Sequence, residues 1–264
     1  MRRCVVQVCS TFAAMGVAIT MAGFSESRAM VDVMLLLLHC TGHVMKADPC
    51  KNAAELQVPY NTSFLATCRN GLPVSRHKCA GNNAVAWAWE SFAGVDMRLE
   101  SLLSGATNRT EPRRVLVYSV GAHYFAQFPG HQGDHYHNHG TAEVELKYPR
   151  AWMSQYYRDM EHLMSWLSSW RERNICVIWK TNNIGWAPLP TGHPSQSHGA
   201  HHYLNHWNIA MAEAAGLHVF DVEPLTLTYS KRHWNHSRPK HDFYHSYDFI
   251  AMSQALISFI RTNC

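Results

Sequence analysis

Two short segments at opposite ends of the chain carry the residue types that acyl chemistry needs. Ser25 lies in the segment Gly23–Arg28, between a short, partly β-branched apolar run and a Met- and Leu-rich run. Such a strand-to-helix turn can present a serine hydroxyl above a sheet edge, at the positive end of a helix. Asp242 and His245 lie three residues apart near the C-terminus. Together the segments supply a nucleophile, a base and a group that orients the base.

Each of these candidates also has an ordinary structural interpretation. Ser25 is expected to be the nucleophile, but a serine before polar residues and an apolar run is also a helix N-cap signature. His245 is expected to be the base and Asp242 its orienting acid, but the pair also suits a surface turn in a chain with 19 histidines. His241 and Asp248 are nearby competitors for the same two roles.

A tetrahedral intermediate also needs preorganised donors for its oxyanion. The backbone N–H of Ser25 is one candidate, and the turn formed by Gly121 and His123 offers backbone or imidazole donors. Gly121 could equally serve only to end a strand. Arg28 is expected one turn into the helix on the side of Ser25, where it could contact a substrate carboxylate, brace the loop or form a structural salt bridge.

The elements that must position these residues alternate along the chain. Unbroken apolar runs predict buried parallel strands, and runs with helical spacing predict amphipathic helices. The expected strands are 14–24, 85–89, 114–120, 175–179 and 217–222. The expected helices are 26–39, 95–103, 148–173, 204–215 and 248–261. This alternation predicts a three-layer α/β/α sandwich with a mostly parallel, flavodoxin-like central sheet.

The same alternation predicts one domain over residues 1–264, since no internal repeat or Ser/Gly linker interrupts it. Residues 40–83, which contain several Pro, Gly and Asn residues, are expected to form an irregular insertion. In such folds ligands bind at the carboxyl ends of the strands. Ser25, the turn at residues 121–123, the loop from Asn182 to His202 and the segment after Val222 are all expected at that edge.

Composition excludes several classes of protein. A hydrophobic fraction of 47% with 16% charged residues gives enough apolar material for a core and argues against disorder. The net charge of +4 is mild and its Lys and Arg residues are scattered, so no nucleic-acid footprint is expected. Acyl chemistry requires no cofactor. A His-rich loop could chelate zinc or copper, but solvent exposure is the preferred interpretation and no metal site is assigned; its histidines are His131, His135, His137 and His139.

Cysteine usage and sequons favour the secretory pathway, in the Golgi or outside the cell. The eight cysteines include no CxxC pair, so they are expected to be either disulfides or buried thiols. Sequons occur at Asn61, Asn108 and Asn235. The uncharged run Cys4–Ser25 after two arginines could be a signal peptide or anchor, but a first strand is preferred. A chain clipped from a longer anchored protein would reconcile the two.

The order of these segments resembles the SGNH/GDSL hydrolase superfamily, in particular its PC-esterase-like, trichome-birefringence-like branch. Gly23–Arg28 resembles the Gly-Asp-Ser-x-x-Arg block of that branch, and Val115–His123 resembles its strand ending in Asn-x-Gly-x-His. Val177–Thr181 resembles the later strand of the form Val-Phe-Arg-Thr, and Asp242–His245 resembles the Asp-x-x-His block. The likeness extends from about Val17 to Ile260.

This resemblance implies a serine-dependent esterase or O-acyltransferase that acts on an acylated carbohydrate or another small ester through an acyl-enzyme. Two residues depart from the pattern. Phe24 replaces the usual Asp of the Gly-Asp-Ser-x-x-Arg block, and Ser119 replaces the usual Asn of the Asn-x-Gly-x-His block. These departures favour the alternative, a catalytically inactive SGNH-fold module that binds a glycan or a protein. The residues indicate neither the acyl donor and acceptor nor the oligomeric state.

Overall fold

Parallel strands form the centre of the molecule. The computed structural model describes residues 16–23, 27, 30–31, 33–34, 74–78, 84–89, 103, 113–120, 150–183, 198–227 and 249–264. The strands within these residues are β1 (Val17–Gly23), β2 (Val74–Lys78), β3 (Ala84–Trp89), β4 (Arg113–Tyr118), β5 (Cys176–Lys180) and β6 (His218–Phe220). The labelled helices are α7 (Arg150–Glu172), α8 (His198–Ala214) and α10 (Phe249–Asn263).

The strands are ordered β2-β3-β1-β4-β5-β6 in one sheet. Every neighbouring pair is parallel except β2 and β3, which are antiparallel. Numbered along the chain, the five parallel strands β1, β3, β4, β5 and β6 therefore have the spatial order 2-1-3-4-5 of flavodoxin-like folds. The order reverses between β1 and β4, so the topological switch point lies where these two strands end.

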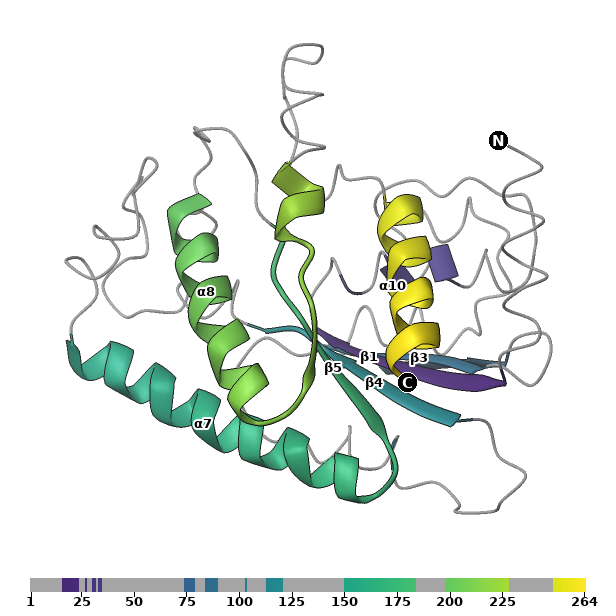
Figure 1. Cartoon of the computed structure of the whole chain (residues 1–264), viewed down its shortest axis with the longest axis horizontal. Helices are drawn as coiled ribbons and strands as arrows, with labels where there is room; N and C mark the ends of the chain where they lie inside the picture. The colour runs from purple at the N-terminus through teal and green to yellow at the C-terminus, as the bar shows by residue number, and fades with distance from the viewer. Residues whose placement is uncertain are drawn as a thin grey trace, which may run out of the picture.

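Helices cover both faces of the sheet, which makes three layers (Figure 1). Side chains alternate along β4, so Leu116 and Tyr118 pack in one core cluster with α7 and α8, whereas Val115 and Val117 pack in the other with α10. The second cluster also contains Met30, Val31, Val33 and Met34, which follow β1. The expected three-layer sandwich with a mostly parallel central sheet is therefore confirmed.

A disulfide bond joins the sheet to the last helix. Cys176 is the first residue of β5, and it is bonded to Cys264, which directly follows α10. The C-terminal end of α10 therefore lies at the edge where the parallel strands begin. The 15 residues of α10 span about 22 Å, and Figure 1 shows the helix extending away from that point. Its first residue, Phe249, accordingly lies toward the edge where the strands end.

Most of the expected elements match the structure, and two expectations were wrong. Residues 74–78 belong to the segment 40–83 that was expected to be irregular, yet they form β2, whose backbone pairs with β3. Helix α8 begins at His198, six residues before the expected start at residue 204, because buried contacts of His201 and Asn205 hold a His-rich turn in helical form. Among the helices that the structure describes, none has the length and apolar character required to cross a bilayer.

Candidate functional site

The switch point between β1 and β4 is too tightly packed for a side chain at Gly23. In the sheet register Ala22 lies opposite Tyr118, and the Ser119 N–H donates to the Ala22 carbonyl oxygen at 2.9 Å. A Cβ atom at Gly23 would lie 2.7 Å from the Ser119 carbonyl oxygen and would also collide with Ser27 Oγ. The glycine is therefore required here because two backbone segments and a buried serine converge.

The residues predicted to do the chemistry are not among the residues that the structure describes. Six predicted site residues lie outside the described part of the chain: Ser25, Arg28, Gly121, His123, Asp242 and His245. Gly23 and the helical residue Ser27 flank Ser25, Val120 precedes Gly121, and Phe249 begins a helix four residues after His245. Their neighbours in the chain thus lie at the switch point, at the end of β4 and at the start of α10.

The segment that follows β1 is in contact with the first turns of α10. Ser253, in the first turns of α10, donates a hydrogen bond from Oγ to the Met30 carbonyl oxygen at 3.4 Å. The side chains of Met30, Met34, Met252 and Leu256 belong to the same buried cluster. The segment that follows Ser25 and the helix that follows His245 therefore pack against each other on one face of the sheet.

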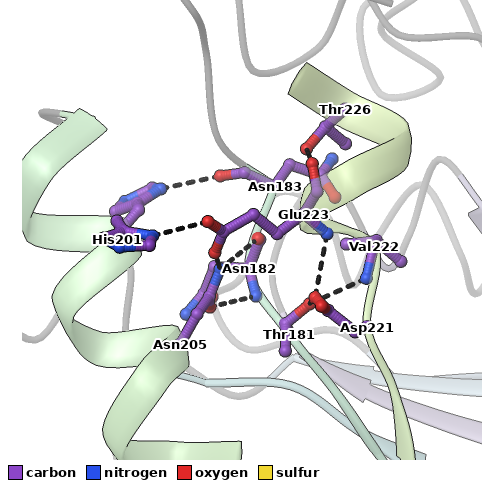
Figure 2. A network of polar contacts seen from close by, with 10 residues as sticks. Thr181, Asn182, Asn183, His201, Asn205, Asp221, Val222, Glu223 and Thr226 are labelled. Atoms are coloured by element: carbon purple, nitrogen blue, oxygen red, sulfur yellow. Dashed lines mark hydrogen bonds and ion pairs between the residues drawn. The ribbon is translucent and has the colours of Figure 1, made fainter. Parts of the chain in front are cut away.

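A polar network occupies the same edge at the ends of β5 and β6 (Figure 2). Thr181 Oγ1 donates to Asp221 Oδ1 at 2.9 Å and accepts from the Val222 N–H at 2.9 Å. Asp221 Oδ1 also accepts from the Glu223 N–H at 3.0 Å, which is the geometry of an N-cap for the helical turn at 223–227. These bonds fix where the backbone leaves β6 and therefore where Glu223 projects.

Asn205 of α8 binds the backbone of Asn182 as a neighbouring strand would. The Asn182 N–H donates to Asn205 Oδ1 at 2.8 Å, and Asn205 Nδ2 donates to the Asn182 carbonyl oxygen at 2.9 Å. Asn205 Nδ2 also donates to Glu223 Oε2 at 3.0 Å. The side chain of Asn205 thereby connects the end of β5, α8 and the turn after β6.

Glu223 and His202 form a carboxylate–imidazole pair within this network. His202 Nδ1 lies 2.5 Å from Glu223 Oε1, and Asn205 occupies the other carboxylate oxygen. Because a carboxylate oxygen only accepts, His202 Nδ1 carries the proton of this hydrogen bond. The His202 side chain is 49% exposed. Sequence reasoning missed this pair, because it joins α8 to the turn after β6 across 21 residues.

Two further buried residues belong to the end of β5. His201 Nδ1 donates to the Asn183 carbonyl oxygen at 2.8 Å. Lys180 is fully buried, and its Nζ donates to the Thr181 carbonyl oxygen at 3.0 Å and to Asn183 Oδ1 at 3.3 Å. Lys180 and Thr181 end the segment that resembles the Val-Phe-Arg-Thr block. The basic residue of this segment is therefore buried at the carboxyl end of β5.

Within the described ranges, no group of three or more His, Cys, Asp or Glu side chains is arranged to hold a metal ion. The His-rich loop lies outside those ranges, and the metal alternative for it stays untested. What the described part of the edge offers is hydrogen-bonding and acid–base chemistry: amide groups fixed by their neighbours, one carboxylate–imidazole pair and a buried ammonium group.

Comparison with known proteins does not identify a family. No family model matches the chain, and no curated protein matches it. A distant structural similarity links it to LAE5, an alpha/beta hydrolase enzyme from the metagenome of Lake Arreo, Spain. That similarity covers 95% of each chain at 11% identity, with a TM-score of 0.42. A likeness at this level identifies neither a family nor a reaction.

Proposed function

We propose that this protein is an SGNH-type ester hydrolase or O-acyltransferase that uses Ser25, His245 and Asp242. Its substrates would be acylated carbohydrates or other small esters. The observation that carries the proposal is the contact between Ser253 and Met30, because it brings the segments that follow Ser25 and His245 to the same side of the sheet. A nucleophile and a base that far apart in the chain require such a contact.

The topology of the sheet also supports this proposal. Ligands in open α/β sheets bind outside the carboxyl ends of the strands, at the switch point. Ser25 follows β1 by two residues, and β1 borders that switch point. The close approach of Gly23 to Ser119 and Ser27 is the packing expected of a sharp strand-to-helix turn that displays a nucleophile.

The proposed reaction follows from the roles of the three residues. Ser25 Oγ attacks the ester carbonyl carbon while His245 accepts its proton, and the alcohol leaves with that proton. Asp242 holds the imidazole in the required tautomer and stabilises its charged form. The backbone N–H of Ser25 and donors from Gly121 and His123 would stabilise the oxyanion, and Arg28 would contact the substrate. Water or a hydroxyl acceptor then takes the acyl group.

Turnover of p-nitrophenyl acetate tests the proposal directly. We expect Ser25→Ala to reduce the enzyme-catalysed rate of p-nitrophenyl acetate hydrolysis by about 10³-fold or more, because removing a nucleophile leaves only binding and oxyanion stabilisation. Ser27→Ala is the matched control, since it removes a buried hydroxyl from the same turn. Equal rates in wild type and Ser25→Ala would favour the non-catalytic binding module instead. Loss of activity in Ser27→Ala alone would assign the nucleophile to Ser27.

We further propose that the protein functions in an oxidising compartment of the secretory pathway. The disulfide between Cys176 and Cys264 supports this proposal, because such bonds persist in secreted proteins and are rare in the cytosol. Occupied sequons would add support. Protein purified from a eukaryotic secretory host should therefore lose mass on treatment with an N-glycosidase. Its 176–264 disulfide-linked peptide should appear in a non-reduced digest, and a reduced pair would contradict the proposal.

A further inference from the structure

The side chain of Asn182 has an unused hydrogen-bond acceptor at the carboxyl edge of the sheet. Asn182 is 1% exposed, and its Oδ1 accepts no hydrogen bond from the part of the chain that the structure describes. A buried acceptor without a donor is costly, by about 1–3 kcal/mol. Buried polar atoms of this kind therefore point to a donor that arrives from elsewhere.

The orientation of this amide is determined by its neighbour. Asn182 Nδ2 donates to the Val120 carbonyl oxygen at 3.3 Å, at the end of β4. Rotating the amide by 180° would place Oδ1 against that carbonyl oxygen, and two acceptors would then face each other. The unused atom is therefore an acceptor, which requires a hydrogen-bond donor on the ligand.

The position of Asn182 is equally well determined. Its backbone N–H and carbonyl oxygen are both held by Asn205, whose own amide is oriented by Glu223 Oε2. Glu223 is in turn held by His202 and by the cap that Asp221 provides. This chain of contacts preorganises Asn182 before any ligand binds, which is the arrangement that makes a single hydrogen bond selective.

The surroundings of Asn182 favour a neutral donor. Lys180, the last residue of β5, lies two residues before Asn182, and its amino group would repel a cationic ligand when protonated. Carboxylate and phosphate groups carry no donor when ionised. A hydroxyl or an amide N–H group carries a hydrogen-bond donor and no positive charge, so it fits this position.

From these contacts we infer that Asn182 is a specificity-determining residue that accepts a hydrogen bond from a hydroxyl or amide N–H group of the substrate. This inference rests on the proposed function. Asn182 follows β5, which is two strands away from β1, and Ser25 follows β1. Strand spacing places the end of β5 about 10 Å from the end of β1, the strand that Ser25 follows in the chain. Asn182 therefore recognises a group remote from the ester, in the part of the substrate beyond the scissile bond.

Three acetate esters test this inference: hexyl acetate, 6-hydroxyhexyl acetate and 6-acetamidohexyl acetate. In the second and third esters a hydrogen-bond donor lies about 9 Å from the carbonyl carbon when the alkyl chain is extended. This length is close to the distance covered by two strand spacings. The quantity measured is the ratio of kcat/KM for each donor-bearing ester to that for hexyl acetate. We expect Asn182→Ala to lower one of these ratios about tenfold, because one buried hydrogen bond distinguishes the esters.

Asn208→Ala is the matched control. Asn208 is also fully buried, accepts from the Tyr156 hydroxyl at 2.8 Å and has an amide nitrogen that donates to none of the described residues. Because it lies between α7 and α8 rather than at the sheet edge, its removal should leave both ratios within about twofold of wild type. If Asn182→Ala does not fold, Asn182→Ser replaces it, since the backbone contacts with Asn205 are retained.

The outcomes separate this inference from the proposed function. Ratios that are unchanged in Asn182→Ala, in an enzyme whose turnover depends on Ser25, would overturn the inference and leave the proposed function intact. Hydrolysis of none of the three esters, together with equal p-nitrophenyl acetate turnover in wild type and Ser25→Ala, would contradict the proposed function. In that case binding of 6-hydroxyhexyl acetate is followed by the NMR shift of the Asn182 side-chain amide, and a shift that does not saturate overturns the inference.

Discussion

Ser253 donates a hydrogen bond to the carbonyl oxygen of Met30, although 223 residues separate the two in the chain. Their side chains are both fully buried, so the contact lies within the core rather than on its surface. It joins the last helix to the segment after the first parallel strand. The segment after β1 and the first turns of α10 are therefore packed together in the core.

The size of residue 253 should therefore control both stability and activity. Ser253→Ala loses one long hydrogen bond and should lower the free energy of unfolding by about 1 kcal/mol with little change in ester turnover. Ser253→Leu should lower it by about 2–3 kcal/mol, because added volume in a packed core separates α10 from residues 30–34. Urea denaturation measures the free energy of unfolding, and p-nitrophenyl acetate hydrolysis measures turnover. A Ser253→Leu protein with wild-type turnover would contradict the proposed coupling between this contact and catalysis.

Gly23 should tolerate no side chain. Gly23→Ala places Cβ 2.7 Å from the Ser119 carbonyl oxygen, a backbone atom that cannot rotate away, and we expect a loss of about 3 kcal/mol in the free energy of unfolding. Gly16→Ala is the control, because its Cβ would meet nothing within 4 Å and only its positive φ of 61° opposes the change. That variant should lose about 1 kcal/mol. In thermal unfolding, the midpoint temperature of Gly23→Ala should therefore be lower than that of Gly16→Ala.

Asn205 should contribute strongly to stability, because it is buried and binds the backbone of Asn182. Asn205→Ala removes both hydrogen bonds to the Asn182 backbone and leaves a buried N–H and a buried carbonyl oxygen unsatisfied. We expect the free energy of unfolding to fall by about 2–4 kcal/mol. His206→Ala, one position further along α8 and exposed, should change it by less than about 0.5 kcal/mol. Equal effects of the two substitutions in chemical denaturation would show that the hydrogen bonds between Asn205 and the Asn182 backbone, which together form a clamp, do not stabilise the fold.

The disulfide bond should contribute substantially to stability. Replacing both Cys176 and Cys264 with Ser removes the cross-link between residues 88 positions apart, and we expect a loss of about 2–4 kcal/mol. Guanidinium denaturation under non-reducing conditions measures the difference. Dithiothreitol should then destabilise wild type more than it destabilises the double variant. Equal sensitivity of the two proteins to the reductant would show that this bond does not stabilise the fold.

The fold could be predicted from the sequence where one physical signal dominated. The unbroken apolar runs that became β4 and β5 are buried on both faces, and the helical spacing of Leu163, Leu167 and Trp170 gave α7 its buried side. The segment that became β2 (Val-Ser-Arg-His-Lys) has no such signal. It is an edge strand formed through backbone hydrogen bonds to β3, and these leave little trace in the side chains.

The candidate site was only partly predictable, for a related reason. Alternating strands and helices were enough to place Asn182 and the segment after Val222 at the carboxyl edge. The clamp between Asn182 and Asn205 and the pair formed by His202 and Glu223 were not predicted. These contacts depend on how α8 approaches two strand ends, which is a tertiary relationship that no local spacing encodes. The early start of α8 has the same origin, since tertiary contacts override the weak helix propensity of its histidines.

The covalent link between Cys176 and Cys264 also determines how the molecule responds to proteases. Any single backbone cut between these two residues would leave both fragments joined, since each retains one of the bonded sulfur atoms. The enclosed stretch includes residues 184–197 and 228–248, so a nick within either range would not release a fragment. Such damage would leave the mass of the intact chain increased by one water and would become visible on a gel only after reduction.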